Sequence, residues 1–199
     1  MIKRAIGLTL PAVFFCVGLS AQVAWESPFF MPPGSAPGLG IYLVDHEPGG
    51  LGALFTYRRA SAPVGVGLRG GLAEEAGGDL SFLGGVDLAG SLVPASNDVP
   101  IDVMWVIGAG AGIGNEIWIA VPAGISVGAT IEGEGVTLVP YATPRVILDV
   151  ITGPGDDLFL NFAVDLGLNL SFNPNWELRF AATVGDHEGV AVGVNVPLR

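Results

Sequence analysis

A strict two-residue alternation between Leu158 and Phe172 constrains the fold of this chain more than any other feature. Leucine, valine or phenylalanine occupies every even position, while positions 161 to 171 carry asparagine, alanine, aspartate, glycine or serine at the odd ones. This period is that of a β-strand, whose successive side chains point to opposite faces. Val190, Val192, Val194 and Val196 repeat the pattern near the end of the chain. The sequence therefore predicts an all-β fold.

Looser alternating runs, separated by turn signals such as Pro48-Gly-Gly and Asn173-Pro-Asn, extend this pattern through most of the chain. The runs predict ten strands. This is an even number, as bacterial single-chain transmembrane barrels require, and eight strands is the alternative count. Most runs reach the roughly 9–11 residues that a tilted strand needs to cross a bilayer. The predicted strands are 38–45, 51–60, 63–73, 79–92, 100–112, 115–131, 135–150, 157–172, 175–185 and 188–198.

The second face of each strand indicates what surrounds the sheet. A soluble sandwich or soluble barrel would carry lysine, glutamate and threonine there, whereas this chain carries glycine, alanine, serine and asparagine and places most acids in turns. Small residues suit a narrow lumen, and the apolar face then meets lipid, where only a closed sheet pairs every backbone group. We predict a closed antiparallel up-and-down transmembrane β-barrel.

The N-terminal segment has the features of an export signal. Lys3 and Arg4 precede a short apolar stretch over 5–19, and Ser20 and Ala21 are small residues of the kind found at cleavage sites. A retained anchor helix is the alternative. We expect a signal peptide over 1–21, a proline-rich extended arm over 22–37 and the barrel over 38–199.

Charge and cysteine content exclude some partners. Without residues 1–21 the chain keeps six arginines and all nineteen acids, a net charge of 6 − 19 = −13, and neither lysine nor cysteine. Nucleic acid needs clustered lysine and arginine, so it is not an expected partner. No disulfide is available to the mature chain, and no cofactor motif is found.

Over residues 38–199 the pattern resembles the small bacterial outer-membrane β-barrel proteins, and the stretches 121–128 and 140–145 look like segments common in them. The resemblance implies an exported, porin-like barrel in the outer membrane of a Gram-negative-type bacterium, in a structural or passive narrow-pore role. It also implies the lipid bilayer, lipopolysaccharide and the barrel insertion machinery as partners. Two features depart from the family: the chain lacks its terminal aromatic residue, and Pro122, Pro140 and Pro144 remove ladder donors. We expect bulges or local irregularity at these prolines.

Two lumen ion pairs are predicted from the phase of the strands, with both termini placed on the periplasmic side. Counting out from the connecting turns sets Arg145 opposite Asp165 and Arg69 near Asp87, all facing inward. Each partner would neutralise a charge that is costly to bury in a narrow lumen. A gate or selectivity role is the functional alternative to this structural one.

The two histidines lie in a repeated tripeptide at two predicted extracellular turns, Asp45-His46-Glu47 and Asp186-His187-Glu188. Closure of the barrel would make these turns neighbours, and histidine with carboxylates is a weak candidate site for a divalent metal. Solvated polar turns are the alternative. No metal is assigned.

Two other functions stay open from the sequence. One is a lipocalin-like barrel of the periplasm or outer membrane that binds a small ligand in its lumen. The other is a surface enzyme comparable to the omptin-type proteases, which use aspartate and histidine at the barrel mouth; the predicted turns are too short for a substrate cleft. We expect no enzymatic activity and no catalytic residues.

Overall fold

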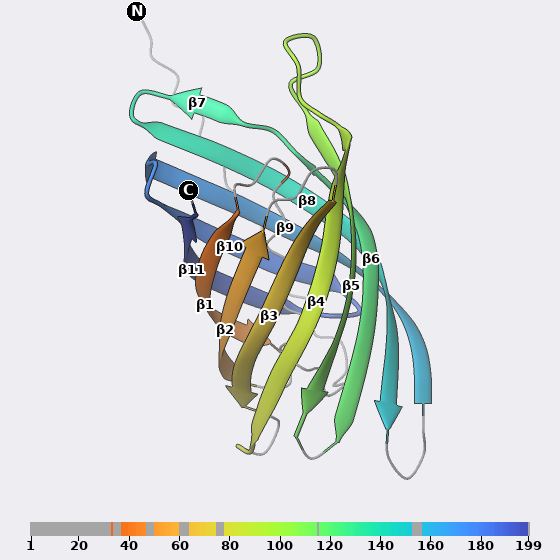
Figure 1. Ribbon diagram of the computed structural model, residues 1–199. Helices are drawn as coiled ribbons and strands as arrows, with labels where there is room; N and C mark the ends of the chain where they lie inside the picture. Colours follow the sequence, from red (N-terminus) through yellow and green to blue (C-terminus); the bar gives the residue numbers. More distant parts are fainter. Residues whose placement is uncertain are drawn as a thin grey trace, which may run out of the picture.

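A computed structural model describes residues 33, 37–46, 50–59, 64–74, 78–114, 116–152 and 157–198. Their regular structure consists of antiparallel strands (Figure 1). No helix in these ranges is long and apolar enough to cross a membrane. The strands are β1 (Gly38–His46), β2 (Leu51–Arg59), β3 (Val64–Glu74), β4 (Leu80–Val93), β5 (Asp102–Ile113), β6 (Ile117–Gly128), β7 (Ile131–Gly133), β8 (Val136–Thr152), β9 (Asp157–Asn173), β10 (Trp176–Gly185) and β11 (Gly189–Pro197).

The sheet closes on itself. Consecutive strands pair antiparallel, β1 pairs with β11 from Gly38↔Pro197 to His46↔Gly189, and β6 pairs with β8. The short β7 follows β6 directly and pairs with the start of β8, so it extends the β6 position of the wall. Within the described ranges, ten strand positions therefore form a closed antiparallel barrel, which confirms the predicted fold class and count.

The two faces of the wall differ as the alternation predicts. Along β9, Leu158, Leu160 and Phe162 are exposed on the outside, whereas Ala163 and Asp165 are buried on the inside. Leu158 is 66% exposed, and Asp165 is fully buried at 0%. An exterior of exposed leucine, isoleucine, valine and phenylalanine suits hydrocarbon, and the inward side chains fill the lumen.

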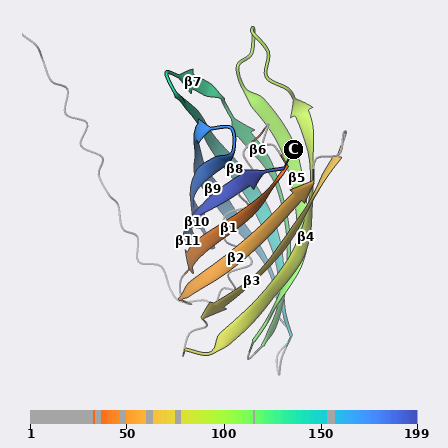
Figure 2. The same ribbon diagram turned by 60° about the vertical axis from the view of Figure 1, so that its left-hand side comes forward.

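The two rims of the barrel differ in shape. The β4–β5 connection and the β7–β8 hairpin project beyond the other strands at the end that holds the C terminus (Figures 1 and 2). At this same end, the rings of Phe172 and Trp176 lie on the two sides of the β9–β10 turn, with centroids 6.2 Å apart. We call the rim that holds the C terminus the terminal rim and the opposite rim the distal rim.

The prolines interrupt the ladder without shifting it. No pairs form between Ile107↔Ala123 and Gly110↔Ala120, where Pro122 turns its nitrogen toward β5, yet both pairs share one register. The β6–β8 ladder has the same kind of gap at Pro144. Pro140 lies opposite the break between β6 and β7, where its carbonyl accepts a bond from Ala129 N. The predicted local irregularity is therefore present, but not as a bulge at these positions.

Most of the N-terminal segment, including the predicted signal peptide, lies outside the described residues. Pro33 is buried, and its Cδ lies 3.0 Å from the position that a Cβ on the inward-facing Gly128 would take. Pro37 lengthens the β1–β11 pairing, because its carbonyl accepts a bond from Leu198 N. Pro33 thus lies inside the wall near the terminal rim.

Candidate functional site: the polar belt and apolar plug of the lumen

Polar and charged side chains of the inner wall gather into clusters that we call the polar belt. The recurring geometry is a row of three residues on adjacent strands, in which the middle residue is glycine. Because glycine has no side chain, its two flanking residues can meet across it. These rows explain why residues two strands apart interact.

The first cluster joins three strands around Asp87 of β4. Arg58 pairs with Gly67 of β3, and Gly67 pairs with Asp87. A Cβ on Gly67 would lie 2.4 Å from Asp87 Oδ1, so the carboxylate occupies the space that glycine leaves. Arg58 Nη2 donates to Asp87 Oδ1, and Arg69 Nε donates to Asp87 Oδ2 at 3.2 Å. The structure thus brings Arg69 and Asp87 together and adds Arg58.

The second cluster centres on Asp165 of β9. Arg145 Nη2 and Nε lie 3.1 and 3.3 Å from Asp165 Oδ1, and Thr183 Oγ1 donates to the same oxygen at 2.7 Å. The strand register differs from the expected one by two residues. Arg145 lies opposite Ala163, and Asp165 lies opposite Thr143. The ion pair therefore forms diagonally, not directly across the ladder.

The third cluster lies nearer the terminal rim. Arg179 Nη2 donates to Glu177 Oε2 at 2.8 Å on the same strand. Its Nη1 lies 3.4 Å from the hydroxyl of Tyr42 across Gly193, which pairs with both residues. Asn195 Nδ2 donates to Glu177 at 3.4 Å. No ion pair of this cluster was predicted from the sequence.

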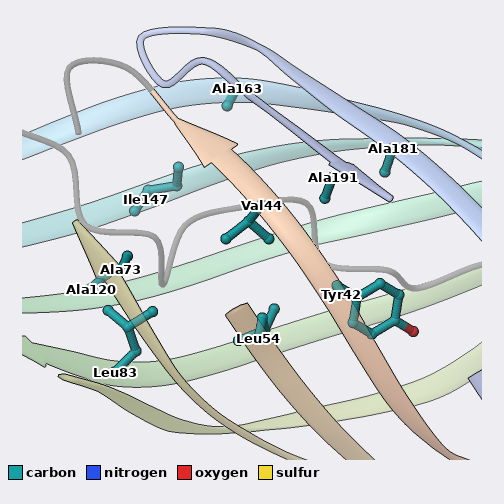
Figure 3. Packing of buried hydrophobic residues seen from close by; sticks show 10 residues of the cluster. All are labelled: Tyr42, Val44, Leu54, Ala73, Leu83, Ala120, Ile147, Ala163, Ala181 and Ala191. Carbon is teal, nitrogen blue, oxygen red and sulfur yellow. The ribbon is translucent and has the colours of Figure 1, made fainter. Parts of the chain in front are cut away.

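Buried apolar side chains gather in the lumen toward the distal rim, and we call them the apolar plug. Val44, Leu54 and Ile147 are at most 1% exposed and project into the same space from three different strands (Figure 3). Alanines complete the layer and leave room for these larger side chains. The full cluster is Tyr42, Val44, Leu54, Ala73, Leu83, Ala120, Ile147, Ala163, Ala181 and Ala191.

The β10–β11 turn folds over the distal rim. His187 is 3% exposed, and its Nε2 lies 2.9 Å from Asp149 Oδ2. Asn161 Nδ2 donates to the same carboxylate oxygen at 2.6 Å. Asp186 points elsewhere: its carboxylate accepts a bond from Phe162 N at 2.8 Å, and its own N donates to the Phe162 carbonyl.

The two histidine tripeptides are neighbours, because His46 pairs with Gly189. Their metal-binding residues do not gather among the described side chains, which contain no group of three histidine, cysteine or acidic residues able to hold a metal. His187 interacts with Asp149, and Glu188 is partly exposed. Asp45 is exposed. The His46 side chain and Glu47 lie outside the described residues.

Buried charges of the described lumen balance. Arg58, Arg69, Arg145 and Arg179 face inward, and so do four acids, Asp87, Asp149, Asp165 and Glu177. Each of these acids lies within salt-bridge distance of an arginine or of His187. The arrangement neutralises charge inside a narrow space, as burial requires.

No protein-family model matches the sequence, and no curated protein matches it. Among solved structures, the KdgM porin is similar at 10% identity and a TM-score of 0.41, over 81% of this chain and 99% of that one. LpxR from Salmonella typhimurium is similar at 10% identity and a TM-score of 0.41, over 90% of this chain and 80% of that one. A de novo designed transmembrane β-barrel has 13% identity and a TM-score of 0.38, covering 82% and 98%. Similarities with sequence identities and TM-scores as low as these assign neither an activity nor a transported solute to this chain.

The closed sheet, its apolar exterior and its filled polar interior define the class of this protein. It is a transmembrane β-barrel.

Proposed function

We propose that this chain is a structural barrel of the outer membrane whose lumen does not form an open channel. The observation that carries the proposal is the burial of inward-facing side chains in two successive layers. In the apolar plug, Leu54 and Ile147 are fully buried, and in the polar belt Asp87 and Asp165 are at most 1% exposed. A solute would have to displace both layers.

The charge balance of the lumen supports the same function. A pore that selects ions presents unpaired charges of one sign along its path. Here each of the four inward acids lies beside an arginine or His187, and each of these contacts is held by a further hydrogen bond or a second partner. The charged residues therefore stabilise the wall and do not line a water-filled path.

Conductance in planar bilayers tests the proposal. We expect no stepwise conductance from the natural chain and clear steps from Leu54→Ala/Ile147→Ala, which empties the plug. The matched control is Phe55→Ala/Leu148→Ala, which removes the adjacent outward-facing side chains and should stay silent. Regular conductance steps from the natural chain would refute an occluded lumen.

We further propose that the chain is exported by a signal peptide to the outer membrane of a Gram-negative-type bacterium, with lipopolysaccharide and the insertion machinery as partners. The apolar exterior supports this placement, because such a surface needs lipid or detergent. Membrane fractionation with heat-modifiable gel mobility tests it. A protein that remains monodisperse in plain buffer would contradict it.

A second candidate function is binding of a small polar ligand in the lumen. Tyr141 Oη and Asn169 Oδ1 are buried and have no hydrogen-bond partner among the described residues. They lie on the facing strands β8 and β9, and a buried donor and acceptor call for water or a ligand hydroxyl. Glucose is a suitable probe: a rise in melting temperature that Tyr141→Phe abolishes would support binding, and no rise would exclude this sugar.

A further inference from the structure

A groove crosses the outer wall of the barrel on the side of β6, β8, β9 and β10. Its volume is about 530 Å³, and the residues around it are apolar except for Arg145. The floor is one row of register partners, Gly124, Arg145, Ala163 and Gly185. The Arg145 side chain points inward to Asp165, so its backbone is what the floor contains.

Short side chains make the groove. The row of outward side chains along one side of the floor contains Pro144, Val164 and Val184. The row along the other side begins with Ala123. Larger residues stand at the ends and edges, with Phe162 among them. Three spacings between neighbouring strands give the floor a length of about 14 Å. The groove is thus a long, shallow, apolar channel and not a round pocket.

One end of the groove lies at the distal rim. Gly185 is the last residue of β10, and the next residue, Asp186, is exposed in the β10–β11 turn. The other end lies at Ala123 and Gly124, in the middle of β6. The groove therefore runs from the polar edge of the barrel to the middle of its lipid-facing wall.

We propose that this groove binds one acyl chain of a membrane lipid from the leaflet at the distal rim. The groove is continuous with the exposed apolar exterior, so hydrocarbon and not water surrounds it. Its direction matches a lipid whose head group lies at the polar edge and whose chain descends toward the middle of the bilayer. The inference rests on the lipid-facing exterior and is independent of whether the lumen conducts.

Native mass spectrometry of the full chain, extracted in mild detergent and titrated with lipid A, the lipid of the leaflet that the predicted orientation places at the distal rim, tests the site. Ala123→Phe fills the groove, and Val66→Phe adds the same ring at an exposed outward position on β3, three strands away from β6 and outside the groove. We expect the natural chain and Val66→Phe to retain one lipid at detergent concentrations at which Ala123→Phe retains none. Heat-modifiable mobility reports whether each variant folds, and Val184→Phe fills the groove from its other end if Ala123→Phe does not fold.

The possible results separate cleanly. Loss of the retained lipid in both groove-filling variants, but not in the β3 control, would support the site. Equal retention in all variants would refute it. A natural chain that is dimeric and becomes monomeric on filling the groove would replace the acyl chain with a second copy as the occupant, and would also refute it.

Discussion

Removing the charge of Asp165 should destabilise the barrel far more than removing an exposed acid. Asp165 and Arg145 have side chains that are 0% and 1% exposed, and Asp165 Oδ1 accepts from Arg145 at 3.1 Å and from Thr183 at 2.7 Å. Asp165→Asn keeps the shape but leaves a buried guanidinium without its counter-charge. Breaking a buried pair in this way costs about 3–5 kcal/mol. Asp157→Asn, at an exposed rim position, should change stability by less than about 0.5 kcal/mol.

Urea unfolding of the barrel in phosphatidylcholine vesicles, followed by tryptophan fluorescence and gel mobility, measures this difference. At an unchanged m value, a lower midpoint reports the lost free energy. The double variant Arg145→Met/Asp165→Leu removes both charges and should regain most of the loss, because apolar replacement of a whole buried pair is often neutral or stabilising. If Asp165→Asn unfolds at the natural midpoint, or if the double variant is as unstable as the single one, the pair does not act through charge compensation.

Two other substitutions test local features of the lumen. Gly167→Ala should destabilise the barrel by about 1–3 kcal/mol, because its Cβ would lie 2.0 Å from Tyr141 Cζ. Gly84→Ala, where nothing lies within 4 Å, is the control and should leave the urea midpoint unchanged. His187→Ala removes the 2.9 Å contact with Asp149 and should cost about 1–3 kcal/mol. Hydrogen exchange should then rise in the β10–β11 turn and not in the rest of the wall; unchanged exchange there would mean that His187 does not hold the turn.

The strand positions could be predicted from the sequence because lipid and lumen impose opposite demands on neighbouring residues. Leu158 to Phe172 shows this, since almost every second residue must be apolar for the exterior. The turns follow from proline, glycine and asparagine, and β9 begins at the predicted residue 157. Alternation fixes which face of the sheet a residue occupies, and Arg69, Asp87, Arg145 and Asp165 are buried on the inner face.

Register is less accessible, because it depends on where each turn closes. The prediction set Arg145 opposite Asp165, whereas the structure sets Arg145 opposite Ala163, and pairing continues to Ile151↔Asp157. The difference is two residues, an even number, so every side chain keeps its face while its partner changes. Arg145 has a side chain long enough to reach Asp165 despite the shift.

The lumen residues that were not predicted depend on strand register, which the alternation of side chains does not reveal. Arg58 reaches Asp87 only because Gly67 lies between them, and that row appears once two registers are known. The contact between Arg179 and Tyr42 likewise required the position of Gly193. His187 lies in a turn, where no periodic pattern indicates whether a side chain folds inward.

Pairing between β1 and β11 has a consequence for chain engineering. Since Gly38 and Pro197 are partners at one rim, the ends of the first and last strands are close enough to be joined by a short linker. The chain could then be cut at a distal hairpin, such as the one after Glu74, to give a circularly permuted barrel with the same neighbours around the ring. Because the strands form a closed ring, any strand can be the first one in the chain. Permutants opened at different hairpins would therefore measure how much the order in which the strands are synthesised contributes to assembly of the barrel.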